Sequence, residues 1–338
     1  MKLENKYIHD IYWKDLKYDS GYESFCFQNC LKILMEAKDI ENTDFFINRS
    51  LSLLFDSESY EKMLYTHMDV RGLLPGVGVV NRYYNPNLLS KEVFDYNCTF
   101  VSNNKEPIIV GVDSFYLPYT SNYKKNHAVH TAIMCGYDLK NASVYLIDWY
   151  EPWLYKGEIS LEEFLLARDS KNEYDGSIFS GTPIENNWAY IQTIEKKSIE
   201  YLFKNLIDLS VDQYFSDKKD KQGVQALEGV MNILVHCNNP EKYKKIYDNL
   251  YISLKRHKFF CGALENYYIY KSSLLLNDII NIMKEIIIEW DNILLMIIKL
   301  SMRNNESTKN RMLVKFSENI GKEKEICNLI NMFSRSEL

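Results

Sequence analysis

Three residues that lie far apart in the sequence have the side chains that thiol chemistry requires: Cys26, His130 and Asp148. A cysteine thiolate is a nucleophile, an imidazole can take up and return the proton, and a carboxylate can orient the imidazole and stabilise its cation. Cys26 begins a stretch in which apolar residues at 26, 30, 34 and 37 define one face of a helix. A thiol in the first turn of a helix lies near the positive end of the helix dipole, which favours the thiolate.

The sequence leaves two N-caps open for this helix. With Ser24 as the N-cap, Cys26 lies in the first turn; with Ser20 as the N-cap and Glu23 completing a capping box, the helix begins earlier and the dipole affects Cys26 less. Cys30 lies one turn further along the same face and is expected to be a packing residue. Both thiols can also be interpreted as small buried hydrophobic groups, the ordinary role of cysteine in a cytoplasmic protein.

A predicted β-hairpin brings the histidine and the aspartate together. The polar segment Asp138–Asn141 separates two strand-like runs and is typical of a turn. Centring the turn on residue 139 pairs His130 with Asp148, Ala132 with Leu146 and Met134 with Val144. Directly opposite residues of an antiparallel pair have Cβ atoms about 5 Å apart, so we expect His130 and Asp148 to form a hydrogen bond. An ordinary polar cross-strand pair is the alternative, because such registers can slip.

Other polar residues compete for roles in this site. His127 is the second candidate for the base, although three residues before His130 on a strand it would point to the opposite face. Cys26, Cys30, His127 and His130 have the composition of a zinc site, but the two pairs are far apart and the histidines diverge, so we expect no metal and no cofactor. Asp113 ends the apolar run that starts at Pro107. It is expected to hold the loop that follows or to bind a substrate amine, and a turn cap is an equally good interpretation.

The periodicity of the apolar residues predicts two domains. Residues 1–195 mix helix and strand patterns, whereas residues 196–338 show almost only helical periodicity, so we expect an α+β domain followed by an all-helical domain. The predicted strands are Pro107–Asp113, His130–Tyr137, Ser143–Asp148 and Trp188–Ile194. The predicted helices are Cys26–Ala37, Phe45–Phe55, one that follows Ser160, and six near 198–210, 221–236, 241–256, 260–276, 278–302 and 307–334.

Composition excludes several classes of protein. The 338 residues are 46% hydrophobic and 25% charged, which is typical of a globular protein. The polar start of the sequence lacks the apolar core of a secretory signal, and seven scattered cysteines suggest reduced thiols, so we expect a cytoplasmic protein. The net charge of −6 gives no general case for binding nucleic acid. The apolar run Leu274–Leu300 carries six charged residues, which favours a buried helix over a membrane span.

The order of these motifs resembles a known family. Cys26-x-x-x-Cys30-Leu31, the run His130–Asp138 and the run Val144–Asp148 are similar to papain-like, peptidase C39-like domains. Within that group, the phrase Pro107–Tyr119 and the histidine-containing strand resemble the butirosin biosynthesis protein H N-terminal family. The resemblance covers roughly residues 15–195. It implies a papain-like cysteine-protease fold with an antiparallel sheet and a catalytic triad of Cys26, His130 and Asp148.

The resemblance also implies an activity. Such enzymes are acyltransferases that take an acyl or peptidyl chain from the phosphopantetheine thioester of a carrier protein and transfer it to a small-molecule amine, forming an amide in antibiotic or nonribosomal peptide biosynthesis, including closthioamide-type pathways. Papain-like enzymes usually have a glutamine before the cysteine as oxyanion donor. Here that region is Tyr18-Asp19-Ser20-Gly21-Tyr22, so Ser20, Tyr22 or backbone amides would have to serve.

Two other functions fit the same residues: a cysteine peptidase, and a non-catalytic binding protein that keeps the fold. Carrier proteins are typically acidic, so the basic runs Lys242–Lys245 and Lys255–Lys258 are candidate docking patches for an acyl or peptidyl carrier protein. A solvated helix face is the alternative explanation of either run.

Overall fold

The computed structural model describes most of the chain. The described residues are 4–16, 25–58, 63–66, 71–150, 153–177, 179–215 and 221–337. The candidate oxyanion donors Ser20 and Tyr22, and the candidate caps Ser20 and Ser24, lie outside the described residues.

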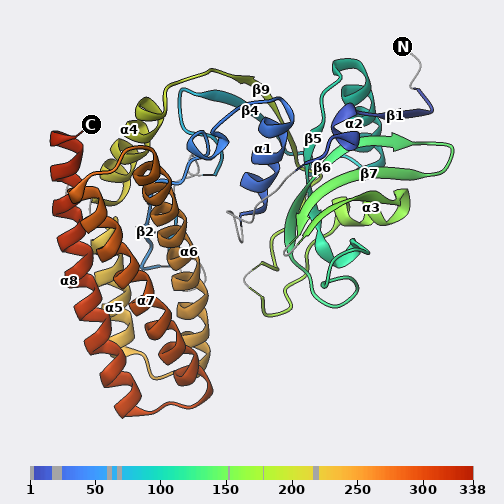
Figure 1. Cartoon of the computed structure of the whole chain (residues 1–338). Coiled ribbons are helices and arrows are strands. Elements are labelled where there is room, and N and C mark those ends of the chain that lie inside the picture. The colour runs from blue at the N-terminus through green and yellow to red at the C-terminus, as the bar shows by residue number, and fades with distance from the viewer. Residues whose placement is uncertain are drawn as a thin grey trace. The chain divides into compact units, whose positions relative to one another are not determined.

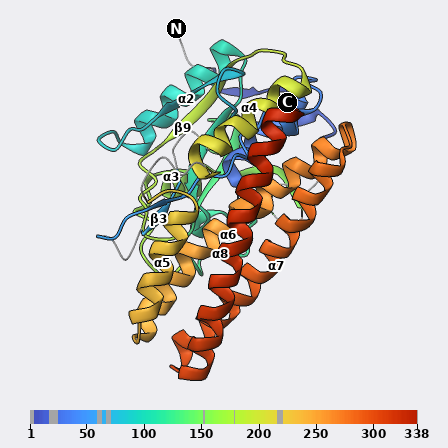
Figure 2. The same ribbon diagram turned by 90° about the vertical axis from the view of Figure 1, so that its left-hand side faces the viewer.

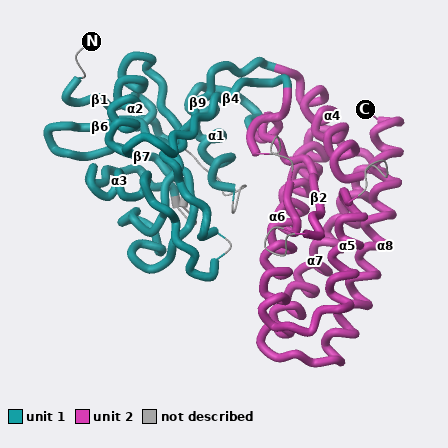
Figure 3. Tube along the Cα trace, turned by 180° about the vertical axis from the view of Figure 1, so that it is seen from behind, with its two compact units in different colours: residues 1–43, 76–196 teal, residues 44–75, 197–338 magenta. Residues whose placement is uncertain are grey.

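The chain divides into two compact units (Figure 3). Unit 1 contains residues 1–43 and 76–196, and unit 2 contains residues 44–75 and 197–338. The division after Lys196 lies one residue from the predicted boundary. Residues 44–75 differ from the prediction, because they belong to the second unit and not to the first.

Unit 1 is built on an antiparallel sheet of seven strands (Figure 1). The strands follow the order β4-β9-β5-β6-β7-β8, and β1 pairs with β6. Their bounds are β1 Lys6–Ile8, β4 Gly78–Tyr83, β5 Ile108–Asp113, β6 Val129–Asp138, β7 Ser143–Tyr150, β8 Trp153–Ser160 and β9 Trp188–Ile194. The α+β class is therefore confirmed. The four predicted strands correspond to β5, β6, β7 and β9, whereas β1, β4 and β8 were not predicted.

Three α-helices pack on this sheet: α1 (Cys26–Ala37), α2 (Ser90–Asn104) and α3 (Leu161–Asp169). Figure 1 shows α1 and α3 on either side of the sheet. The predicted cap at Ser160 is present, because its side chain accepts a hydrogen bond from the Glu163 amide. Helix α2 was not predicted, since much of its sequence consists of residues with modest helix propensity. Short 3₁₀ turns are η1 (Asp10–Trp13) and η4 (Ser114–Tyr116).

Unit 2 contains long helices that run side by side (Figures 1 and 2). They are α4 Ile199–Ser210, α5 Val224–His236, α6 Pro240–Tyr270, α7 Leu274–Met302 and α8 Glu306–Ser336, with a π-helical turn, η5, at Val211–Phe215. The two helices predicted near 241–256 and 260–276 form the single helix α6. The apolar run Leu274–Leu300 lies within α7, and apolar residues of this helix are buried, among them Met283, Ile286, Trp290, Leu294 and Ile297.

The described residues of this segment, 44–58, 63–66 and 71–75, are not helical, apart from the end of the 3₁₀ turn η2 (Thr43–Phe45). Their strands β2 (Leu54–Phe55) and β3 (Leu64–Tyr65) form a small antiparallel pair, so the predicted helix at Phe45–Phe55 is wrong and unit 2 is not all-helical. The Leu51 amide donates to the Ser210 hydroxyl, and the Leu53 carbonyl accepts from the Gly223 amide. These hydrogen bonds to distant residues hold the segment in a non-helical conformation, although its local apolar pattern predicted a helix.

Within the described residues, none of the helices is both long and apolar enough to cross a membrane.

Candidate active site

The thiol of Cys26 stands on the first residue of a helix. Helix α1 begins at Cys26 after Phe25, whose side chain makes no capping bond, and the Asn29 amide donates to the Phe25 carbonyl over 3.0 Å. The observed N-cap is therefore Phe25, neither of the two serines considered. Because Cys26 lies in the first turn, its amide has no acceptor within the helix and its thiol lies at the positive end of the dipole.

A histidine and a carboxylate stand behind this thiol. The Nε2 atom of His130 lies 2.8 Å from Oδ2 and 3.0 Å from Oδ1 of Asp148. The Asp148 side chain is 1% exposed and that of His130 is 14% exposed. A hydrogen bond with His130 is among the interactions that lower the pKa of the Cys26 thiol. Since Nε2 is engaged by Asp148, we assign the bond to Cys26 to Nδ1. The structure thus brings together all three residues of the candidate triad.

The hairpin register differs from the prediction. In β6 and β7, Ile133 pairs with Ile147 and Met134 with Leu146, and the register shifts between Met134 and Gly136. Continued along the strands, this register places Ala132 opposite Asp148, so His130 is a diagonal neighbour of the carboxylate and not its direct partner. Diagonal Cβ atoms are about 7–8 Å apart, a gap that long side chains span. This explains why the distal nitrogen, Nε2, reaches Asp148.

A β-bulge at Cys135 makes this contact possible. At the turn, Asp138 pairs with Ser143, and this register continued without a bulge would put His130 and Asp148 on opposite faces of the hairpin. The extra residue at 135 restores the shared face. The Cys135 carbonyl accepts a hydrogen bond from the His9 amide over 2.8 Å. The turn was predicted too close to the β6 side of the hairpin, and no feature of the sequence indicated the bulge. The predicted cross-strand pairs are therefore wrong, although the contact between His130 and Asp148 forms.

Electrostatics in the site favour an ion pair between thiolate and imidazolium. Burial acts to raise the pKa of Cys26, but the hydrogen bond and charge of His130 outweigh it, and this pKa is lowered from its ordinary value of 9.0. Burial acts to lower the pKa of His130, but Asp148 and Cys26 raise it well above 6.5. Both shifts favour transfer of the proton from the thiol to the imidazole, which would leave a nucleophilic sulfur.

Cys30 has the opposite character. It is 1% exposed, and its sulfur donates to the carbonyl of Thr131 over 3.6 Å. Burial raises its pKa well above 9.0. A protonated, enclosed thiol one turn below Cys26 is a packing residue, as expected from the sequence.

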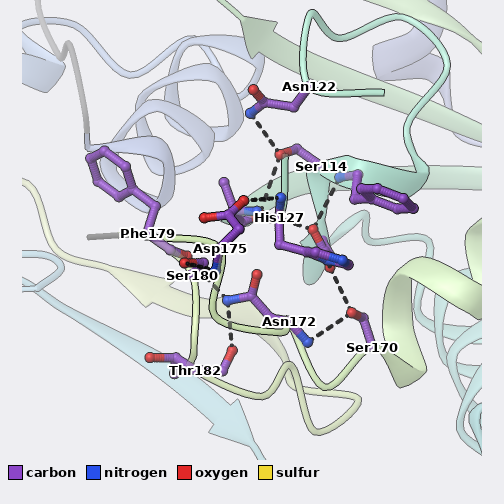
Figure 4. Close-up of polar contacts among 12 residues, drawn as sticks. Ser114, Asn122, His127, Ser170, Asn172, Asp175, Phe179, Ser180 and Thr182 are labelled. Atoms are coloured by element: carbon purple, nitrogen blue, oxygen red, sulfur yellow. Dashed lines mark hydrogen bonds and ion pairs between the residues drawn. The ribbon is translucent and has the colours of Figure 1, made fainter. Parts of the chain in front are cut away.

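Asp113 and His127 form a second histidine–carboxylate pair (Figure 4). The Nδ1 atom of His127 lies 2.6 Å from Oδ2 of Asp113, which also accepts from the Ser170 hydroxyl over 2.6 Å. The other oxygen of Asp113 accepts from the amides of Phe115 and Ala128. Four donors saturate this fully buried carboxylate. Asp113 is thus a turn cap and holds the loop that follows β5.

The two basic runs differ in exposure. Arg256 and His257 are buried, and Lys258 forms an ion pair with Asp291 at 3.1 Å. The run Lys255–Lys258 is therefore not a continuous basic surface, because α6 turns its middle residues into the core. In the run Lys242–Lys245, Tyr243 is buried.

One hydroxyl in the site was not predicted. The phenol of Tyr119 donates to Oδ2 of Asp148 over 2.9 Å. Tyr119 lies in the loop between β5 and β6, where spacing in the sequence carries no information about the contact.

No family model matches this chain, and it has no significant match among curated proteins. In the described part of the chain, no group of three or more histidine, cysteine, aspartate or glutamate side chains is placed to hold a metal ion. The three side chains of the site suit nucleophilic attack by Cys26, with His130 moving the proton and Asp148 stabilising the imidazolium.

Proposed function

We propose that this protein is a cysteine-dependent acyltransferase with a papain-like catalytic unit. The observation that carries the proposal is the chain of contacts from Cys26 through His130 to Asp148, in which the pKa of the thiol is lowered and that of the imidazole is raised. A thiolate at a helix N-terminus with a positioned imidazole is suited to forming and resolving acyl-enzymes.

The reaction proceeds in two steps. The Cys26 sulfur attacks the carbonyl carbon of a carrier-protein thioester; a new carbon–sulfur bond forms, the bond to the phosphopantetheine sulfur breaks, and His130 delivers a proton to that leaving thiolate. An amine then attacks the acyl group on Cys26. The carbon–nitrogen bond of the amide forms, the bond to Cys26 breaks, and His130 accepts the proton that the amine loses. The amide of Cys26, at the free end of α1, is available to the oxyanion.

The substrate class comes from the sequence resemblance. We assign as donor an acyl or peptidyl group on the phosphopantetheine of a carrier protein, and as acceptor a small-molecule amine, in the assembly of an antibiotic or nonribosomal peptide in the cytoplasm. The site needs no cofactor for this reaction, because the donor arrives as an activated thioester and Cys26 exchanges one thioester for another.

Intact-protein mass spectrometry tests the proposal. The protein is incubated with carrier proteins loaded with aromatic and aliphatic acyl groups, and we expect a mass increase equal to the acyl group. The adduct should be absent in Cys26→Ala and present in Cys30→Ala, the matched control one helical turn away. Addition of an amine should then release the acyl group as an amide.

Two outcomes would contradict the proposal. Cleavage of unactivated peptides without reaction at thioesters would indicate a cysteine peptidase. Absence of an adduct with every donor, together with unchanged ligand binding in Cys26→Ser, would indicate a non-catalytic binding protein.

A further inference from the structure

The hydroxyl of Tyr119 forms a hydrogen bond with Asp148, the carboxylate of the candidate triad. Tyr119 belongs to the loop formed by residues 114–127, called here the Tyr119 loop, which joins β5 to β6. Its hydroxyl donates to Oδ2 of Asp148 over 2.9 Å, the same oxygen that lies 2.8 Å from Nε2 of His130. Among the described residues, the carboxylate thus has two side-chain donors, the imidazole of His130 and the phenol of Tyr119.

Asp148 needs this second donor because it is almost completely buried. A carboxylate removed from water keeps its charge only if hydrogen bonds replace the lost hydration. The phenol remains a donor throughout the useful pH range, since burial and the charge of Asp148 raise the pKa of Tyr119 well above 10.0. A permanent donor at Oδ2 stabilises the ionised carboxylate and limits its rotation.

The position of the phenol is itself fixed. The ring of Tyr119 stacks on Tyr155, with centroids 3.7 Å apart and planes 10° apart, and Tyr155 is the cross-strand partner of Asp148. At the base of the Tyr119 loop, Asp113 binds His127 over 2.6 Å. A stacked ring and a closed loop base leave the hydroxyl little freedom to turn away from Asp148.

We infer that Tyr119 is a positioning residue of the Cys26 site, which acts through Asp148 and His130 to maintain the thiolate. The inference deepens the proposed function and rests on it for the identity of the reaction, but the effect on the thiol is measurable without an acyl donor. Removing the hydroxyl leaves the buried carboxylate with His130 as its remaining side-chain donor. Asp148 then stabilises the imidazolium of His130 less, and the thiolate of Cys26 therefore forms at higher pH.

The test is the rate of Cys26 alkylation by iodoacetamide as a function of pH, followed by peptide mass mapping in the wild type and in Tyr119→Phe. We expect the midpoint of the profile to move to higher pH and the rate at pH 6 to fall about threefold to tenfold, a fraction of the full effect of a hydrogen bond to a charged group. The titratable groups that face Asp148 are His130, Tyr119, Tyr155, Cys26 and Cys30.

Tyr155→Phe is the matched control. It keeps the stacked ring and removes a hydroxyl that donates to the Glu158 carbonyl over 3.3 Å, so its alkylation profile should match that of the wild type. A Tyr119→Phe profile that superimposes on the wild type, or an equal shift in both variants, would overturn the inference. Far-UV circular dichroism verifies that each variant is folded.

Where an acyl donor is found, kinetics add a second readout. Tyr119→Phe should lower kcat and leave KM within twofold, because the phenol contacts the carboxylate and not the substrate. If no thioester reacts with any form of the protein, the proposed function fails while the alkylation profiles still decide the role of Tyr119.

Discussion

Two cysteines on one face of α1 show how position controls thiol chemistry at the scale of a residue. Burial acts to raise the pKa of both Cys26 and Cys30, but only Cys26 is bonded to His130, and only its pKa is lowered. Cys30 instead donates to the carbonyl of Thr131. A separation of one helical turn therefore distinguishes a nucleophile from a packing residue.

The alkylation rate of Cys26 should report this difference directly. In the wild type we expect the midpoint of the pH profile to lie below 9.0, because His130 stabilises the thiolate. In His130→Ala the stabilising partner is absent while burial remains, so the midpoint should rise above 9.0. Iodoacetamide labelling from pH 5 to about 10, with mass mapping of the labelled peptides, measures both midpoints.

Cys30 provides the internal reference for that experiment. As a buried thiol with a raised pKa, it should remain unlabelled in the native protein across the range and react only after unfolding. Labelling of Cys26 in His130→Ala with an unchanged midpoint would show that His130 does not activate the thiol.

At the scale of the element, the triad depends on a feature that the sequence does not reveal. Residue types predicted that His130 and Asp148 meet, and the strands on which they lie were also predictable. Their register was not, because the bulge of one residue at Cys135 depends on a distant segment: the amide of His9, the residue that follows β1, donates to the Cys135 carbonyl. The close approach of β1 also requires a glycine at 136, since a Cβ there would clash with the Tyr7 carbonyl oxygen. Such long-range partners leave no local pattern.

A buried polar network joins four helical segments of unit 2. Glu323 on α8 is fully buried; its carboxylate lies 2.9 Å from His257 Nε2 on α6, and it accepts from Trp290 on α7 over 3.0 Å and from Tyr214 in η5 over 2.9 Å. Burial acts to raise the pKa of Glu323 and to lower that of His257, but their mutual attraction reverses both shifts. Both directions favour the charged forms of the pair.

Removing the glutamate charge should destabilise unit 2 strongly. We expect Glu323→Ala to lower the free energy of unfolding by about 3–5 kcal/mol, because it leaves His257 and two further donors without their acceptor in the core. Urea unfolding followed by circular dichroism measures the change. Glu318→Gln, an exposed position on the same helix, is the control and should change stability by less than about 0.5 kcal/mol. An equally small change in Glu323→Ala would contradict the prediction.

The same pair predicts the direction of the pH dependence. The pKa of Glu323 is lowered from 4.5, so its contribution is present above that pH and is lost as pH falls through the lowered value. The pKa of His257 is raised from 6.5, so its contribution is present below that pH and is lost as pH rises through the raised value. The difference in the free energy of unfolding between the wild type and Glu323→Gln should therefore be largest between these two pH values.

At the scale of the whole molecule, the order of residues along the chain differs from their grouping in space. Composition and periodicity predicted a boundary near Lys196, where the chain does pass from unit 1 to unit 2. They could not show that residues 44–75 belong to the second unit, because this segment is held by residues far along the chain: the Leu64 amide donates to Asn249, and the Phe55 amide donates to the Lys221 carbonyl.

The discontinuous second unit predicts how fragments of the chain behave. A fragment of residues 1–196 keeps the segment 44–75 but lacks its partners, which exposes side chains such as Leu51 and Leu53 that are buried in the full chain. We expect limited proteolysis to cut this fragment within 44–75, at sites that are protected in the full chain. Because the Leu74 amide donates to the Phe46 carbonyl over 2.8 Å, the two ends of the segment are adjacent, and a short Gly/Ser linker can replace it. The linked form should resist proteolysis and keep the low alkylation midpoint of Cys26; protection of 44–75 in the 1–196 fragment would instead show that the segment folds without unit 2.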